Sequence, residues 1–139
     1  MKHTHKTSKI KPNVTATYIG SIAAGTDFEH PIFVAPLPCV ITDVQITTST
    51  DITQNDTDYN TYDVQDKGSD GTGTDSIVSA TTKATGGIDV DAFDATSLGT
   101  VSATHSELAT GDVVSFKKTH AGAGQAAPDL TVFVTWKAR

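Results

Sequence analysis

Apolar and polar residues alternate with a period of two in several short segments of the chain, which is typical of β-strands that bury one face. Residues 40–47 show this alternation most clearly. The face expected to lie in the core carries Val40, Thr42, Val44 and Ile46. The same criterion predicts further strands at residues 31–35, 59–65, 77–82, 88–94, 98–104, 113–119 and 130–137.

These eight predicted strands define the expected fold class. No window shows the i, i+3, i+4, i+7 spacing of an amphipathic helix, so helical crossovers between parallel strands are not expected. Valine, isoleucine and threonine are abundant, which favours strands. We therefore predict an all-β antiparallel β-sandwich, and a jelly roll of about eight strands fits the strand count and the glycine-rich connections best.

A glycine-rich stretch at residues 66–75 separates two of the predicted strands. Gly68, Gly71 and Gly73 can adopt the positive φ values that a tight reversal needs, and Asp70 can cap the amides of the turn. The stretch therefore predicts a β-hairpin with a loop longer than two residues. Further structural turns are predicted at two pairs of positions, namely Gly111 with Asp112 and Gly122 with Gly124.

Charge divides the 139 residues into two parts. Four lysines precede the first acidic residue, Asp27. The rest of the chain, from Asp27 onward, contains the other six basic residues and all 16 acidic ones. We predict an extended basic N-terminal arm over residues 1–26 and a single jelly-roll β-sandwich domain over residues 27–139. Because the acidic domain would repel a phosphate backbone, nucleic acid is not an expected partner.

Several other classes are not expected. Cys39 is the only cysteine, which excludes an internal disulfide and a zinc site built from several thiolates. No apolar run is long enough for a membrane-spanning helix, and the N-terminus lacks the apolar segment of a secretory signal. We expect neither a membrane partner nor conventional export.

No residue is assigned a catalytic role. The chain lacks the motifs of nucleophile-elbow hydrolases, zinc proteases, phosphate-binding loops and dithiol oxidoreductases. Its five histidines are scattered, although a catalytic triad whose members meet only in space stays open. We expect a protein that is not an enzyme and binds no cofactor.

Two groups of aspartates allow alternatives. The three aspartates of residues 66–75 could bind calcium, but the single copy of this glycine-rich unit favours a structural turn without a metal. Asp89, Asp91 and Asp94 could act as glycosidase carboxylates. The solvated face of a strand is the simpler interpretation of their alternation.

Five segments, in chain order, resemble motifs of one known family. Residues 66–74 are similar to an Asn-Lys-Gly-x-Asp-Gly-Thr-Gly-Thr turn, with Asp66 in place of the asparagine. Residues 34–44 resemble an apolar-Ala-Pro segment followed by Val-Thr-x-Val, and residues 51–53 resemble an Ala-Asp-Ile-Thr-Gly link. Residues 109–114 resemble a Gly-Asp-Val-Leu turn. Residues 119–129 resemble a Thr-His-Val-Gly-Thr-Gly-x-Ala-x-Pro-Gly loop, in which Asp129 replaces the last glycine.

The family consists of small β-sandwich proteins from tailed-phage head gene clusters, the capsid decoration or cement proteins. The resemblance covers residues 32–135 and implies a jelly-roll protein, usually trimeric, on the outer surface of the phage head where major capsid subunits meet. The partners it implies are the major capsid protein and further copies of the chain, and the location it implies is the virion. The alternative is a carbohydrate-binding β-sandwich module of a phage fibre or surface protein, with candidate rings at Tyr59, Tyr62 and Trp136.

The N-terminal arm provides candidate contacts to the capsid. An extended segment could add to the edge of a capsid sheet while its lysines meet an acidic surface. This hypothesis assigns capsid contacts to Lys6, Lys9, Lys11, Val14, Tyr18, Ile19 and Ile22.

Overall fold

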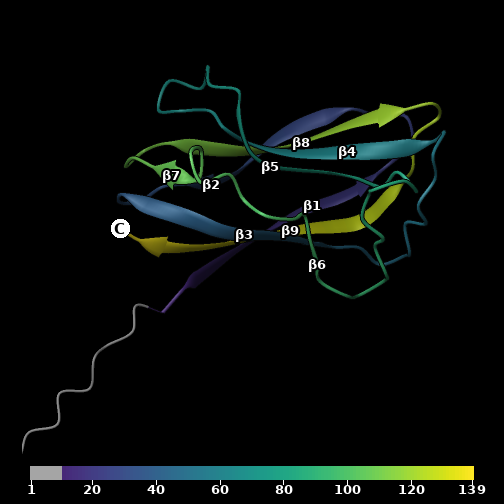
Figure 1. Ribbon diagram of the computed structural model, residues 1–139, viewed down its shortest axis with the longest axis horizontal. Coiled ribbons are helices and arrows are strands. Elements are labelled where there is room, and N and C mark those ends of the chain that lie inside the picture. Colours follow the sequence, from purple (N-terminus) through teal and green to yellow (C-terminus); the bar gives the residue numbers. More distant parts are fainter. Residues whose placement is uncertain (1–10) are drawn as a thin grey trace, which may run out of the picture.

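The computed structural model describes residues 11–139, which form two antiparallel β-sheets stacked face to face (Figure 1). These residues form nine strands and no helix, so the expected all-β sandwich is confirmed. Within this part of the chain no helix is long and apolar enough to span a membrane.

Each sheet brings together strands that are distant in the sequence. The first has the order β1-β9-β3-β6, and β7 also pairs with β3. Its strands are β1 (Asn13–Ile22), β9 (Ala127–Ala138), β3 (Cys39–Thr47), β6 (Thr96–Ser97) and β7 (Glu107–Leu108). The second has the order β2-β8-β4-β5, with β2 (Phe28–Val34), β8 (Val113–Ala121), β4 (Tyr59–Asp66) and β5 (Asp75–Thr81). This order is compatible with a jelly roll.

The first strand differs from the arm expected over residues 1–26. Asn13–Ile22 pairs with β9 along its whole length, from Asn13 opposite Trp136 to Ile22 opposite Ala127. The segment contains no charged residue and several threonines, so it can pair as a strand with one face inward. The sandwich therefore begins before Asp27, and the charge boundary does not coincide with the structural one.

Residues 88–104 also differ from the sequence prediction. The segments 88–94 and 98–104 were expected to be strands, but within this stretch the structure has only the two-residue strand β6 and an isolated bridge between Val90 and Ile52. Phe93 has a φ of 57°, a left-handed conformation that does not continue a strand. Val90 and Leu98 are nevertheless buried. This connection therefore contributes individual side chains to the core although it forms almost no strand.

A register shift decides which face of β3 is buried. Between Ile41 and Asp43 the pairing with β9 slips by one residue. Ile41 therefore lies in the core together with Val44 and Ile46, whereas Thr42 is exposed. The expected inward set of Val40, Thr42, Val44 and Ile46 is wrong at its first two positions, because a bulge exchanges the two faces of a strand.

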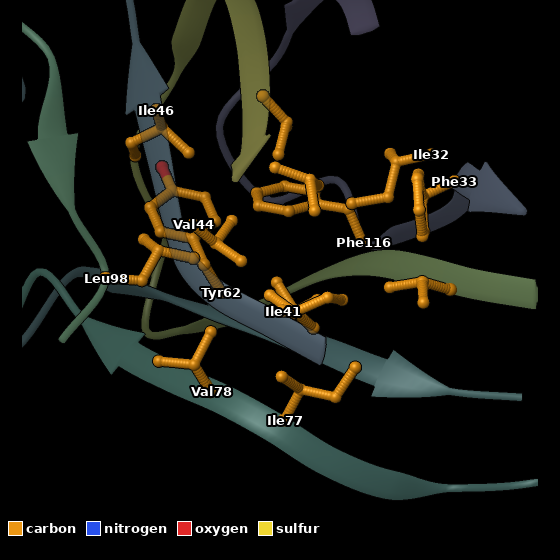
Figure 2. Packing of buried hydrophobic residues seen from close by; sticks show 14 of the residues in the cluster. Ile32, Phe33, Ile41, Val44, Ile46, Tyr62, Ile77, Val78, Leu98 and Phe116 are labelled. Carbon is orange, nitrogen blue, oxygen red and sulfur yellow. The ribbon is translucent and has the colours of Figure 1, made fainter. Parts of the chain in front are cut away.

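The core lies between the sheets and has an aromatic centre (Figure 2). Tyr62 of β4 and Phe116 of β8 stack with their ring centroids 5.5 Å apart, and Phe28 of β2 lies 6.0 Å from Phe116. Ile41 and Val44 approach these rings from the opposite sheet (Figure 2). Tyr62 and Phe116 both belong to the second sheet, and both are completely buried in the core.

Candidate functional site

The glycine-rich turns use backbone conformations that other residues avoid. Positive φ values occur at five of the glycines named above: Gly68, Gly71, Gly111, Gly122 and Gly124. Gly73 is required for a different reason, because a Cβ atom there would lie 2.5 Å from the carbonyl oxygen of Asp66. These turns therefore require glycine, either because the residue has a positive φ or because a neighbouring backbone atom leaves no room for a Cβ atom.

The aspartates of the 66–75 turn bond to the turn itself. Asp66 Oδ1 accepts a hydrogen bond from the Gly68 amide at 2.8 Å. Asp70 Oδ1 accepts bonds from the Thr72 amide at 3.0 Å and the Thr72 hydroxyl at 2.9 Å, and these bonds lower the pKa of Asp70. In residues 11–139 no group of three or more histidine, cysteine, aspartate or glutamate residues is placed to hold a metal ion.

The turn that contains Gly111 and Asp112 is attached to the end of β2. The Gly111 amide donates to the Ala35 carbonyl at 2.8 Å, and the Ala35 amide donates to the Asp112 carbonyl at 2.9 Å. The Asp112 carboxylate accepts the Ala109 amide at 2.9 Å and closes the turn. These residues therefore hold two strand ends together.

A buried asparagine fastens the loop that contains Gly122 and Gly124. Asn60 Oδ1 accepts the Gln125 amide at 3.0 Å, and Asn60 Nδ2 donates to the Gln125 carbonyl at 2.9 Å. This pair of bonds reproduces the pairing of two antiparallel strands. Asn60 Nδ2 also donates to the Tyr62 hydroxyl at 3.0 Å, and burial raises the pKa of Tyr62 to about 12.

Replacing Asn60 by leucine is expected to lower the free energy of unfolding by about 1 to 3 kcal/mol, because the amide and carbonyl of Gln125 lose their partners. Urea denaturation measures the change. The exposed residue Asn13 supplies the control, and its replacement by leucine is expected to change stability by less than about 0.5 kcal/mol. Equal midpoints for the two variants would show that the network does not stabilise the fold.

Asp129 joins three segments at the far end of the first sheet. Its carboxylate accepts the Ser49 hydroxyl at 2.7 Å and the Tyr18 hydroxyl at 2.9 Å, and its amide donates to Ser21 at 3.0 Å. The bonds from Ser49 and Tyr18 lower the pKa of Asp129. Asp129 has a φ of 48°, a conformation that favours glycine, at the position where the family motif has glycine.

The residues assigned to capsid contact are divided between the core and the surface. Ile19 and Ile22 are partly buried and pack against the core. Val14 and Tyr18 remain 61% and 65% exposed, and Lys11 is exposed just before β1. The positions assigned to Lys6 and Lys9 lie outside the described residues. The surface part of this set is thus Lys11, Val14 and Tyr18.

The outer edge of β1 is open within the part of the chain that the structure describes, where β1 pairs only with β9. The strand has ten residues and contains neither a charged residue nor a proline. Such an edge is suited to pairing with another chain. The neighbouring edge strand β2 carries Pro31, which cannot donate a ladder hydrogen bond.

An apolar groove of about 420 Å³ lies between β1 and β9 on one side and β2 on the other. Its lining residues are Thr15, Pro31, Ile32, Phe33, Val34, Pro36 and Trp136. The rings of Phe33 and Trp136 lie 5.4 Å apart, and Trp136 Nε1 donates to the Thr15 hydroxyl at 3.1 Å. Because no lining residue is titratable, this groove is suited to binding an apolar group.

A second hollow of about 330 Å³ adjoins the groove at Pro31. An ion pair at its rim joins Lys67 Nζ to Glu29 Oε1 at 3.0 Å, and the Ser115 hydroxyl donates to the same oxygen at 2.7 Å. The Ser115 bond, followed by the Lys67 bond, lowers the pKa of Glu29. The pair attaches the 66–75 turn to β2.

A buried lysine lies further along β8, three residues beyond Ser115. Lys118 is completely buried, and its Nζ donates to the Thr26 carbonyl at 2.8 Å. Burial lowers the pKa of Lys118. Beside it, His120 Nδ1 lies 2.6 Å from Asp27 Oδ1, an interaction that lowers the pKa of Asp27. Both contacts attach the connection between β1 and β2 to the second sheet.

The three rings considered for carbohydrate binding do not form a shared platform. Tyr62 is completely buried and Trp136 packs on Phe33. Tyr59 is half-buried, with Lys83 Nζ 5.7 Å from its ring centroid.

Comparison of the chain with models of known protein families and with curated proteins gives no match. The surface of residues 11–139 combines an open strand edge, an apolar groove and turns fixed by hydrogen bonds. Such features are suited to binding another protein.

Proposed function

We propose that the protein is a structural virion protein of a tailed bacteriophage. It binds as a homotrimer to the outer surface of the head where major capsid subunits meet, and it stabilises the capsid without catalysis. The observation that carries the proposal is Asp129, which has a φ of 48° at the position of the family's glycine. The loop that resembles the family motif thus has, at the position of the motif's glycine, a backbone conformation that favours glycine, and this supports the proposal.

The physical role proposed for the protein is that of a clamp. A protein that binds the expanded capsid and no other state stabilises that state by linkage. Three copies in one assembly also combine weak contacts into strong attachment. A rigid sandwich with an open edge on β1 suits this role, because strand addition supplies backbone hydrogen bonds to a partner.

The proposal assigns the capsid contact to the exposed part of β1. Val14 and Tyr18 project from the sheet, and Lys11 lies beside its start. Ile19 and Ile22 support β1 from the core side. Lys6 and Lys9 are retained as proposed contacts on the basis of their charge alone.

The experiment uses heads of the phage that encodes the chain, prepared without this protein. Purified protein is added to expanded heads and to unexpanded proheads, and co-sedimentation is measured. We expect saturable binding to expanded heads, together with a higher temperature of head disruption. Absence of binding to both particles, with retention on immobilised glycans, would contradict the proposal and favour a carbohydrate-binding module.

A further inference from the structure

Asp70 and Gly71 form the only Asp-Gly pair in the sequence. In such a pair the backbone nitrogen of the glycine can attack the aspartate carboxyl group and close a succinimide ring. Glycine favours this attack because it has no Cβ atom beside the attacking nitrogen. The pair lies at the tip of the 66–75 turn, so its chemistry depends on how that turn holds the two reacting groups.

The attacking nitrogen of Gly71 is accessible. Residues 69–72 are all exposed, and a Cβ atom at Gly71 would meet nothing within 4 Å. Among residues 11–139, no carbonyl or side chain accepts a hydrogen bond from the Gly71 amide. This amide is therefore free to react without first breaking a bond within the described chain.

The carboxyl group of Asp70 is held close to the peptide that it would attack through. Asp70 Oδ1 accepts hydrogen bonds from the Thr72 amide at 3.0 Å and the Thr72 hydroxyl at 2.9 Å. A bond to the amide two residues ahead folds the carboxyl group back over the intervening Gly71 peptide. The same bonds lower the pKa of Asp70, so only a small fraction of the carboxyl group is protonated at neutral pH and the reaction is slow.

Asp66, in the same turn, provides an internal comparison. Asp66 Oδ1 accepts the Gly68 amide at 2.8 Å, so its carboxyl group also bonds two residues ahead. The intervening Lys67 amide is occupied, however, because it donates to the Val113 carbonyl at 2.8 Å. Lys67 also carries a side chain next to that nitrogen. The arrangement at Asp66 therefore lacks a free attacking amide.

The base of the turn, and not its tip, is attached to the sandwich. The Lys67 amide donates to Val113, the Val113 amide donates to the Gly68 carbonyl at 3.0 Å, and the Gly73 amide donates to the Lys67 carbonyl at 2.9 Å. The bonds of the Asp70 side chain stay within residues 69–72. A longer backbone at the tip therefore leaves the attachment of the base intact.

We infer that Asp70 is a modification site at which the folded protein slowly converts aspartate to isoaspartate without an enzyme. The Gly71 nitrogen forms a bond to Asp70 Cγ, and the carboxyl hydroxyl leaves as water with the amide proton. Water then opens the succinimide. Cleavage between the Gly71 nitrogen and Cγ restores aspartate, whereas cleavage between that nitrogen and the α-carbonyl carbon gives isoaspartate.

The conversion changes the tip without a net change in composition, because the water that leaves is regained. In the product the main chain runs through Cβ and Cγ of residue 70, and the free carboxylate is attached to Cα. Both bonds between Asp70 and Thr72 are expected to be lost. The inference is independent of the proposed function.

Incubation of the folded full chain at neutral pH tests the inference. Trypsin cleaves after lysine and separates residues 68–83, which contain Asp70, from the peptide that contains Asp66. Tandem mass spectrometry with electron-transfer fragmentation then distinguishes isoaspartate from aspartate. We expect isoaspartate to accumulate at position 70 and not at position 66. Its absence at position 70, under conditions that convert a synthetic peptide of residues 66–75, would overturn the inference.

Three variants test the mechanism at the tip. Asp70→Asn is expected to give the same succinimide and the same two products faster, because ammonia leaves instead of water. Asp70→Glu keeps the charge but would need a larger ring, and it is expected to give no isomer. Gly71→Ala is expected to slow the conversion, since a methyl group then lies beside the attacking nitrogen. Failure of Asp70→Asn to form isoaspartate would show that the fold prevents ring closure and would overturn the inference.

Gly86 supplies the matched control for Gly71. Its φ of 76° is close to the 78° of Gly71, and a Cβ atom there would also meet nothing within 4 Å. Gly86→Ala therefore introduces a similar backbone strain away from Asp70, and it is expected to leave the rate of conversion unchanged. Equal rates in the Gly71→Ala and Gly86→Ala proteins would overturn the assigned role of Gly71. A faster conversion in the Gly86→Ala protein would show that the reaction requires unfolding and would overturn the claim that it occurs in the folded protein.

Discussion

Replacing Phe116 by alanine is expected to lower the free energy of unfolding by about 3 to 5 kcal/mol, the usual cost of removing a large buried aromatic ring. Phe116 is completely buried and touches aromatic rings from two neighbouring strands, Phe28 at 6.0 Å and Tyr62 at 5.5 Å between centroids. Its loss leaves a cavity at the centre of the core that the two sheets cannot close. Urea denaturation at a fixed protein concentration measures the change.

The matched control for Phe116 is an exposed apolar residue. Leu37 is 39% exposed in the connection between β2 and β3. Its replacement by alanine is expected to cost less than about 0.5 kcal/mol, as is usual for surface positions. Equal losses at the two positions would mean that burial of the Phe116 ring does not stabilise the core more than an exposed side chain does.

Replacing Gly122 by alanine is expected to destabilise the protein by about 2 to 5 kcal/mol, through a left-handed backbone and a steric overlap together. Gly122 has a φ of 58°, and a Cβ atom there would lie 2.5 Å from the Thr57 carbonyl oxygen and closer still to Asp58 Oδ1. The Thr57 oxygen belongs to the backbone and cannot rotate away. Asp58 would also be displaced from the Ala123 amide that it accepts at 2.7 Å.

Gly71 separates these two contributions. It has a similar φ of 78°, but a Cβ atom there would meet nothing within 4 Å. Gly71→Ala is therefore expected to cost only the backbone contribution of about 1 to 2 kcal/mol. Thermal unfolding of both variants gives the comparison, and a Gly122 variant as stable as the Gly71 variant would show that the loop moves aside without strain.

The sequence predicts the fold best where strands are long and paired in the core. Residues 113–119 and 130–137 fall within β8 and β9. In residues 130–137 the apolar residues Leu130, Val132, Val134 and Trp136 recur at every second position. The bulge beside Asp43 was not predictable, because it depends on pairing with β9 and leaves no local signal. Alternation in residues 88–94 was misleading, because the acidic residues there surround a left-handed turn at Phe93.

The boundary of the domain shows a different limit of sequence reasoning. The lysines that suggested an arm lie within residues 2–11, but the first acidic residue is Asp27, so the charge pattern cannot locate a strand that has no charge. The groove could not be predicted from the sequence either, because its lining comes from β1, β2 and the end of β9, which are distant in the sequence.

The most direct test of the proposed function is electron cryomicroscopy of heads from the phage proposed to encode the chain, compared with heads from a deletion of its gene. We expect three-lobed densities on the outer surface where capsid subunits meet, present in the first particles and absent from the second. Particles that are identical with and without the gene would contradict the proposed role on the capsid.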